Sequence, residues 1–323
     1  MTAGTFTVGD FALFVYFLGF VSECVWVVGM FIARYQQARV SLQRMTTLLA
    51  GAPPERLAQE SDLQLTGPLP EPAVDDASGD PLRELGVEGL TFHYPGTDAG
   101  IENVSLMLPG GSFTVVTGRI GSGKTTLLRA ILGLLPADGG TVRWNGEAVA
   151  DPGSFFVPPR AAYTPQVPRL FSLSLRDNLL LGRTDSGERV EEAIRAAVLE
   201  SDVAAMPAGL ATMVGPLGVR LSGGQVQRAA AARMFLRRPE LLVVDDLSSA
   251  LDVETEKLLW ERLIAERAGT TSLVVSHRRP ALQRADHIVL LEGGRVTAAG
   301  TLNELLEASP EFRRLWEREP NGR

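Results

Sequence analysis

The stretch Gly118-Arg-Ile-Gly-Ser-Gly-Lys-Thr125 decides the fold, because it follows the pattern G-x-x-x-x-G-K-[ST] of a phosphate-binding loop. A predicted strand, Phe113–Thr117, leads into the loop, and a predicted helix, Lys124–Leu134, leads out of it. Glycines adopt backbone angles that other residues resist, so successive N–H groups can turn toward one anion. The helix N-terminus adds the positive end of its dipole. A glycine turn without a ligand is the alternative, and the two flanking elements argue against it.

Two side chains of this loop and a later acidic pair predict a nucleotide site with Mg²⁺. We expect Lys124 to reach the β- and γ-phosphates and the Thr125 hydroxyl to bind the metal. Further along the chain, the apolar run Leu241–Val244 ends in Asp245 and Asp246. Asp245 is the expected Mg²⁺ partner through water, because Mg²⁺ keeps much of its hydration shell. Together these residues predict a P-loop NTPase that uses ATP and Mg²⁺.

The run Leu221-Ser-Gly-Gly-Gln225 narrows the prediction, because it resembles the signature motif of ATP-binding-cassette (ABC) ATPases. Val226-Gln-Arg-Ala229 follows it, as it usually does in that family. Ser222, Gly223 and Gly224 would open a helix and so form a second anion-binding N-terminus. In the family this N-terminus faces the γ-phosphate that the other ATPase domain of a dimer binds. The resemblance therefore implies that a second ABC ATPase half is a partner.

Four further residues match the family's motifs in chain order. Tyr94 resembles the aromatic residue that stacks on adenine, although a tyrosine at a strand edge is the alternative. Gln166 resembles the glutamine that touches Mg²⁺ and links the site to the membrane domain. Asp252 resembles the loop that crosses the dimer interface, and His277 resembles the switch histidine that contacts the γ-phosphate. A lone histidine is more often structural, but its place after a predicted strand favours the functional role.

The resemblance implies which residues form the site. The catalytic residues would be Asp246, His277 and Gln166, and the metal-binding residues would be Thr125, Gln166 and Asp245. The nucleotide would be bound by Tyr94, Gly118, Arg119, Ile120, Gly121, Ser122, Gly123, Lys124, Thr125 and Thr126 of one chain, and by Ser222, Gly223, Gly224 and Gln225 of the other.

Asp246 departs from the family pattern, in which a glutamate orients the attacking water and acts as base. Aspartate is one methylene shorter, which moves the carboxylate by roughly 1 Å, and such a displacement can cost on the order of 100-fold in rate. The signature Leu221–Gln225, which serves the partner's nucleotide, is intact. This combination predicts the degenerate-site half of a heterodimer. A homodimer whose backbone lets Asp246 do the work is the alternative.

Residues 11–33 are nearly all apolar and are interrupted only by Ser22, Glu23 and Cys24. At about 1.5 Å per residue, a helix over this run is about 34 Å long, enough to span a bilayer with some tilt. A signal peptide is a poor alternative, because the run is too long and no small-residue cleavage site follows it. A buried soluble helix is a second alternative. Arginines at positions 34, 39 and 44 follow the run, so the positive-inside rule places residue 1 outside the cell membrane and everything after the run in the cytoplasm.

The sequence predicts three parts. Residues 1–50 form the membrane helix with a cytoplasmic extension, and they resemble the last membrane helix of the exporter type whose halves each carry six helices (type IV). Residues 51–84, rich in proline and acidic residues, form a linker with little fixed structure. Residues 85–319 resemble an ABC nucleotide-binding domain. The resemblance implies a RecA-like α/β core, an antiparallel β part near 85–115 and a helical subdomain near 170–238.

Apolar runs and periodic stretches alternate in the second half of the chain, as in an α/β protein. Besides the strands already named, Leu273–Val275 and Ile288–Leu291 suit buried strands, and Arg189–Leu199, Val226–Arg237 and Thr255–Glu266 suit helices.

Composition restricts the function classes. The net charge of −7 and a pI of about 5.2 argue mildly against a nucleic-acid partner, and a single cysteine excludes an intrachain disulfide. Two alternatives stay open: a non-transport ABC ATPase, which the apolar run disfavours, and a regulatory subunit that binds ATP but scarcely hydrolyses it, which Asp246 keeps open. One membrane helix cannot line a pathway. We therefore expect additional transmembrane helices to be supplied elsewhere, or the chain to be a gene fragment or to begin at a misassigned start.

Overall fold

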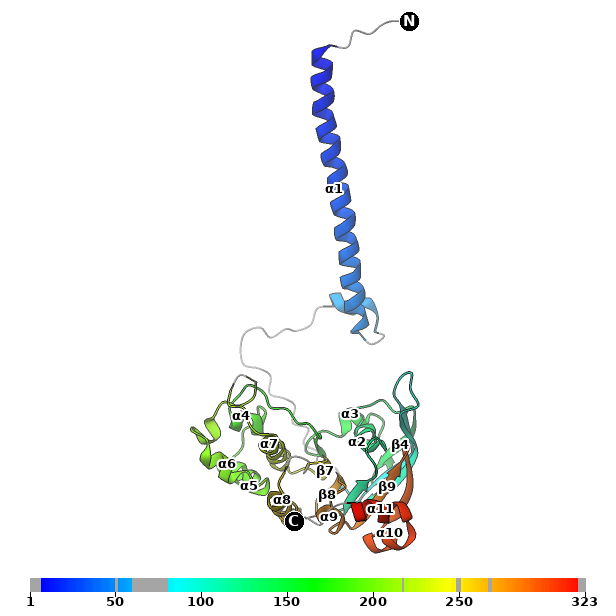
Figure 1. Ribbon diagram of the computed structural model, residues 1–323, viewed down its shortest axis with the longest axis vertical. Helices are drawn as coiled ribbons and strands as arrows, with labels where there is room; N and C mark the ends of the chain where they lie inside the picture. The colour runs from blue at the N-terminus through cyan, green and yellow to red at the C-terminus, as the bar shows by residue number, and fades with distance from the viewer. Residues whose placement is uncertain are drawn as a thin grey trace. The chain divides into compact units, whose positions relative to one another are not determined.

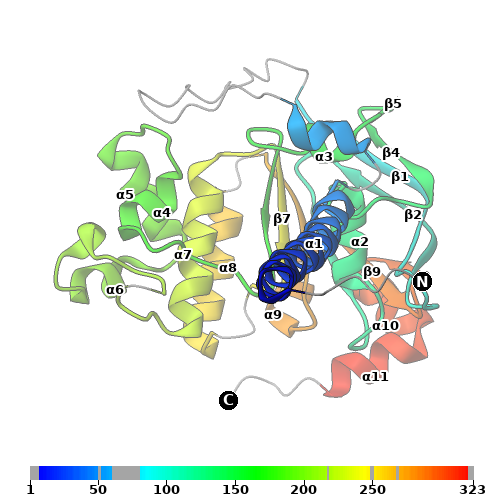
Figure 2. The same cartoon turned by 90° about the horizontal axis from the view of Figure 1, so that it is seen from above.

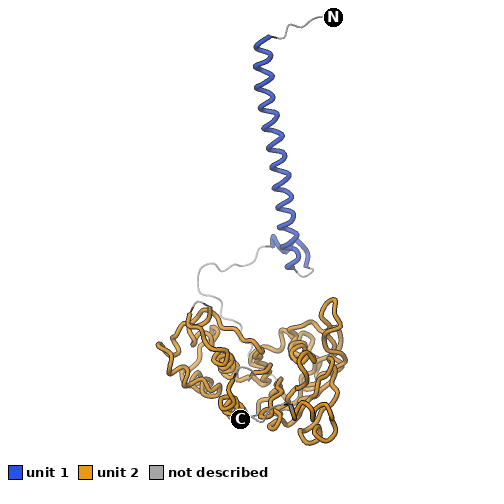
Figure 3. The backbone as a smooth tube through the Cα atoms, viewed as in Figure 1, with its two compact units in different colours: residues 1–74 blue, residues 75–323 orange. Residues whose placement is uncertain are grey.

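The structure is a computed structural model that describes residues 7–49, 52–59, 81–216, 218–247, 251–266 and 269–318 (Figure 1). It divides into two compact units, residues 1–74 and residues 75–323 (Figure 3). Most of the predicted linker, residues 60–80, lies outside the described residues, and so does the expected domain end at residue 319.

The first unit consists mainly of α1 (Val8–Thr47), a helix of 40 residues, followed by the short 3-10 helix η1 (Pro54–Ala58). Thr7 caps α1: the Asp10 N–H donates to Thr7 Oγ1 at 3.2 Å, and the Thr7 N–H donates to the Asp10 carboxylate at 2.9 Å. By length and composition α1 is able to cross a membrane, and none of its residues is buried within the structure. The apolar run and the polar helical stretch after it are therefore one continuous element.

The second unit begins with an antiparallel sheet of four strands in the order β2-β1-β4-β5. On β1, buried apolar residues alternate with more exposed residues, and a β-bulge between Val87 and Leu90 shifts the alternation so that Leu85, Val87, Leu90 and Phe92 all lie in the core. Burying a side chain of this size stabilises the fold by about 1.5–3 kcal/mol. The strands are β1 (Glu84–His93), β2 (Gly100–Pro109), β4 (Gly139–Trp144) and β5 (Glu147–Ala148).

A second sheet of six strands, in the order β10-β9-β3-β8-β7-β6, forms the centre of the unit. The adjacent strands β9, β3, β8, β7 and β6 pair in parallel, and β10 pairs antiparallel with β9. Every residue of β3, β7 and β8 is buried, which explains why these strands are rich in apolar residues. The strands are β3 (Phe113–Thr117), β6 (Ala161–Thr164), β7 (Leu241–Asp245), β8 (Thr271–Val275), β9 (His287–Glu292) and β10 (Arg295–Gly300).

Helices cover both faces of this sheet, and α2 and α7 lie on opposite sides of β7 (Figures 1 and 2). The buried side of α2 packs between the two sheets through Leu127, Leu128 and Ile131. The range expected to be helical contains α4, α5, α6 and α7. The helices are α2 (Lys124–Ile131), α3 (Pro152–Phe155), α4 (Leu175–Leu180), α5 (Gly187–Ala196), α6 (Glu200–Ala205), α7 (Gly223–Leu236), α8 (Val253–Glu266), α9 (Arg279–Leu282), α10 (Leu302–Ala308) and α11 (Pro310–Arg318), with a 3-10 turn η2 (Gly209–Ala211).

Element ends differ from the sequence expectations by a few residues. β1 starts at Glu84, and the N–H of the buried Leu82 donates to Glu240 Oε2 at 2.6 Å, so this domain begins before residue 85. α2 ends at Ile131 rather than at residue 134, because Gly133 turns the chain with φ +67°. α7 starts at Gly223, three residues before Val226, because Ser222 caps it.

Candidate active site

The loop between β3 and α2 has the backbone that a phosphate cradle requires. Gly118, Gly121 and Gly123 have φ values of +147°, +79° and +98°. A Cβ on Gly118 would lie 2.1 Å from the Leu291 carbonyl oxygen of β9, so no other residue fits there. The loop thus passes tightly over the end of the sheet and opens α2 at Lys124.

The Lys124 ammonium lies over its own loop. Its Nζ donates to the carbonyl oxygens of Gly118 and Arg119, each at 2.8 Å. Partial burial lowers the pKa of Lys124, and the negative charges of Asp245 and Asp246 oppose that effect. The arrangement puts one cation among backbone donors at the end of β3.

Asp245, the last residue of β7, faces the start of α2. Asp245 is 1% exposed, and its Oδ2 accepts a hydrogen bond from the Tyr163 hydroxyl at 3.5 Å. Burial raises the pKa of Asp245, while the neighbouring Thr125 hydroxyl acts to lower it. A hydroxyl and a carboxylate in contact are hard oxygen donors of the kind that Mg²⁺ takes. Among the described residues there is no cluster of three or more His, Cys, Asp and Glu side chains that could hold a metal.

Asp246, Gln166 and His277 lie at the same end of the sheet. The Asp246 N–H donates to the Val275 carbonyl oxygen at 3.0 Å, and Gln166 Nε2 donates to Asp246 Oδ2 at 3.3 Å. Asp246 has φ +51°, a left-handed conformation that aspartate tolerates better than most residues. His277 is exposed two residues beyond β8, which pairs with β7 through Asp245 and Val275. These three side chains therefore border the same end of the sheet as the loop.

Tyr94 follows β1 and lies beside the first turn of α2. Its hydroxyl is 3.3 Å from Thr126 Oγ1, and its ring packs edge-on against Phe92 with centroids 5.0 Å apart. The residue is 37% exposed, so one side of the ring is open to solvent.

The signature residues lie on another element. Ser222 caps α7: its Oγ accepts from the Gln225 N–H at 3.3 Å, and Gln225 Oε1 accepts from the Ser222 N–H at 2.8 Å. Ser222 and Gly223 are exposed, and α7 lies across β7 from α2. Ser222–Gln225 thus lie on a different element from the other predicted site residues, which lie on or next to β1, β3, β6, β7, β8 and the start of α2. Asp252 accepts from the Thr255 N–H at 2.9 Å at the start of α8, whereas residues 248–250 lie outside the described residues.

Sequence reasoning missed several residues that hold the site in place. Arg129 lies beside Tyr163, whose hydroxyl donates to Asp245 Oδ2 at 3.5 Å. Arg119 donates to Glu311 of α11 at 2.6 Å, and the same helix accepts from Arg279 at the Trp316 carbonyl oxygen at 2.7 Å. Arg279 comes two residues after His277. No sequence signal could have paired residues 119 and 311, which are 192 positions apart.

Comparison with known proteins agrees with this geometry. Residues 101–249 match the family described as ABC transporter. A probable multidrug resistance ABC transporter ATP-binding/permease protein of Bacillus subtilis is 32% identical over 315 residues, which are 97% of this chain and 51% of the relative. The ATP-dependent lipid A-core flippase of Escherichia coli K12 is 35% identical over 237 residues, which are 72% of this chain and 40% of the flippase.

A solved structure has the same fold. A bacterial Atm1-family ABC exporter with ATP bound aligns with a TM-score of 0.72 at 24% identity, over 98% of this chain and 53% of its own. The chain thus spans about half, or less, of the length of the proteins that it matches.

Proposed function

Because this chain carries the ATPase domain of the ABC transporter family behind one long apolar helix, we propose that it powers export across a membrane as one subunit of a transporter. The observation that carries the proposal is the convergence of Lys124, Thr125 and Asp245 at one end of the six-stranded sheet. The relatives named above are a lipid A-core flippase and a probable multidrug resistance transporter, which supports outward transport. The site that binds the transported substrate and the remaining membrane helices would be supplied by other parts of the transporter.

The chain's own residues would act mainly by positioning and by charge. Lys124 would leave its loop carbonyls to bind the β- and γ-phosphates, and the loop N–H groups would hold the oxygens between them. Thr125 and Asp245 would hold Mg²⁺, which neutralises phosphate charge when bound. Tyr94 would stack on adenine with its open face. Ser222–Gln225 would bind the γ-phosphate of the partner's nucleotide through the N-terminus of α7.

The proposed site is asymmetric. Asp246 reaches one methylene less than a glutamate, whereas the cap of α7 is complete. We therefore propose that this chain is the weakly hydrolysing half of a heterodimer, in which fast turnover occurs at the partner's phosphate loop against Ser222. A regulatory subunit with little hydrolysis is a second candidate that the same observation favours.

Two rate measurements test the asymmetric proposal. Asp246→Glu should raise hydrolysis at this chain's own site, and Ser222→Ala should slow the heterodimer more than Asp246→Asn does. Lys124→Ala in the same background identifies the turnover that belongs to this chain's site. Rapid ATPase activity of the purified chain alone, lost on Asp246→Asn, would favour a homodimer and overturn the asymmetry.

We also propose that α1 crosses the cell membrane with residue 1 outside and the ATPase domain in the cytoplasm. The arginines at positions 34, 39 and 44 support this orientation. An ionised Glu23 facing lipid near the bilayer centre would cost about 2.5–3.5 kcal/mol or more, so it would face neighbouring helices. Protease added outside oriented vesicles should leave the ATPase domain intact, and cleavage of that domain from outside would refute the topology.

A further inference from the structure

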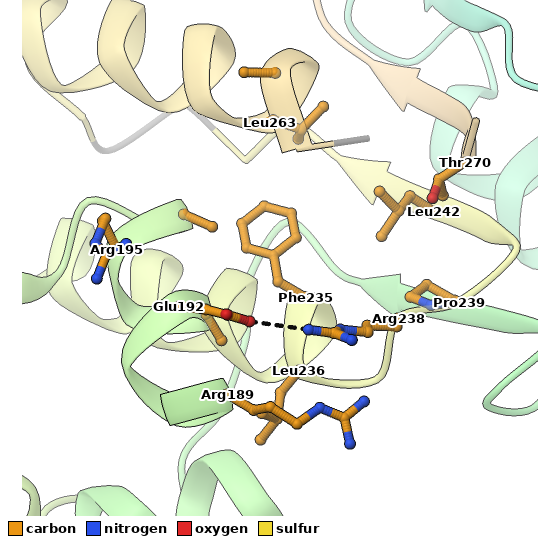
Figure 4. Close-up of a pocket in the computed structure, with 13 residues that line it drawn as sticks. Arg189, Glu192, Arg195, Phe235, Leu236, Arg238, Pro239, Leu242, Leu263 and Thr270 are labelled. Carbon is orange, nitrogen blue, oxygen red and sulfur yellow. Dashed lines mark hydrogen bonds and ion pairs between the residues drawn. The ribbon is translucent and has the colours of Figure 1, made fainter. Parts of the chain in front are cut away.

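A cavity of about 580 Å³ lies where the helical part meets the six-stranded sheet (Figure 4). Its lining comes from α5, the end of α7, β7 and α8, and it contains no residue of the phosphate loop or of the signature. Pockets that bind small molecules usually measure about 300–1,000 Å³ and have largely apolar walls with a few polar groups. This cavity has the size and position of a second ligand site.

The floor of the cavity is apolar. Leu236, Leu242 and Leu263 are almost fully buried, yet each contributes to the lining. The ring of Phe235 stands in the gap between α7 and α8, directed toward Leu263 (Figure 4). An alkyl or aryl group inserted here would exclude water from these side chains and gain the free energy of burial.

The rim of the cavity is cationic. It carries Arg189, Arg195 and Arg238 against one acid, Glu192, which pairs with Arg238 at 2.9 Å. Even when Asp185, the partner of Arg189 at 3.1 Å, is counted, three positive charges face two negative ones. The whole chain has a net charge of −7, so this local excess runs against its general balance.

We infer that the cavity binds an amphipathic carboxylate, with its apolar chain on the Phe235 floor and its head group on the arginine rim, where it would compete with Glu192 for a guanidinium. Arginine suits this role because its planar guanidinium matches a carboxylate in a bidentate fashion and is weakly hydrated. A ring or short chain ending in a carboxylate would satisfy the floor and the rim at once.

The site is placed to be regulatory. α7 begins at the Ser222 cap and ends at Leu236 in the cavity wall. β7 passes the cavity at Leu242 and ends at Asp245. A bound ligand would therefore touch the end of α7 opposite the signature and the part of β7 that leads to Asp245. Through these two elements, ligand binding would change the affinity of the chain for ATP.

Equilibrium dialysis of labelled 4-phenylbutyrate against the full chain in lipid nanodiscs, with empty nanodiscs subtracted, tests binding. Neutralising either of two rim arginines, Arg195→Gln or Arg238→Gln, should weaken binding by up to about tenfold, because each removes a positive charge that attracts the carboxylate. Arg195→Glu combined with Arg238→Glu should abolish it. The control is Lys257→Glu, a single charge reversal on α8 outside the cavity, which should leave affinity unchanged. A retained affinity of each variant for ATP shows that the domain is folded.

Ligand chemistry provides a second, mutation-free arm. Butyrate lacks the ring, and 4-phenylbutylamine has the opposite charge. Each should bind at least about tenfold more weakly than 4-phenylbutyrate. Equal binding of the amine, or equal binding to the doubly reversed variant, would overturn the site. If the site is regulatory, saturating 4-phenylbutyrate should change the affinity of the chain for ATP by at least about twofold. Because coupling is reciprocal, saturating ATP should change the affinity for 4-phenylbutyrate by the same factor. An unchanged ATP affinity would overturn the regulatory role while leaving the ATPase assignment intact.

Discussion

Replacement of Asp202 by alanine should loosen the start of α7, the helix that carries the signature. Asp202, on α6, accepts from Gln225 Nε2 at 2.8 Å and from Arg228 at 2.6 Å. The first of these bonds orients the Gln225 amide so that its oxygen accepts from the Ser222 N–H. The side chains of Arg228 and Asp202 are only 13% and 16% exposed, so solvent screens their pairing weakly.

The magnitude follows from these contacts. A hydrogen bond to a charged group contributes about 1.5–3 kcal/mol, and removing one partner of a largely buried ion pair costs about 3–5 kcal/mol. Arg228 keeps its bond to the Val198 carbonyl oxygen, which limits the loss. We therefore expect Asp202→Ala to destabilise the domain by about 2–4 kcal/mol, and Asp202→Asn, which retains an acceptor for Gln225, to cost less.

Denaturant unfolding and hydrogen exchange measure this effect at two levels. The unfolding midpoint should fall, and the amides of residues 223–228 should exchange faster than in the unaltered chain. Glu191→Ala, an exposed position on α5, is the matched control and should change stability by less than about 0.5 kcal/mol. If Asp202→Ala matched that control in both stability and exchange, the proposed orientation of Gln225 by Asp202 would be wrong.

Three further changes have defined outcomes. Lys124→Ala should abolish useful ATP binding in titration calorimetry, because the phosphates lose their mobile cation, and unchanged affinity would contradict the phosphate-loop assignment. Gly118→Ala should destabilise the domain by more than about 2 kcal/mol, because its Cβ would lie 2.1 Å from the Leu291 carbonyl oxygen. Burial raises the pKa of Asp245 above its ordinary 3.8, so in the absence of Mg²⁺ stability should fall as pH rises through that raised pKa. Asp245→Asn should remove this fall, and parallel melting curves for variant and parent between about pH 3.5 and pH 8 would refute it.

Strands and the loop were predictable because their signals are local. β3 and β7 are wholly buried, so each is a short, mainly apolar run; β3 leads into the glycine loop, and β7 ends at Asp245. The glycine spacing of the loop likewise reflects a backbone that only glycine can follow, as at Gly118. The α/β fold class and the relation to ABC transporters could therefore be predicted from the order of residues alone.

Long-range pairings could not be predicted. The bond between Leu82 and Glu240, the Asp202–Gln225 contact and the Arg119–Glu311 pair depend on how distant elements pack, and they leave no periodic trace in the sequence. The end of α2 was misjudged for a related reason, since a turning glycine, Gly133, moves a boundary without changing the apolar pattern.

The C-terminal helix α11 acts as a brace between two parts of the nucleotide site. One end holds Arg119 of the phosphate loop through Glu311, and the other holds Arg279, close to His277, through Trp316. The guanidinium of Arg279 also stacks over the Trp316 ring at 4.9 Å. Truncation at residue 309 would remove both attachments at once and free the loop and the histidine turn together. Helix α11 therefore supports the candidate site from outside, and shortened versions of the chain should retain this helix through Arg318.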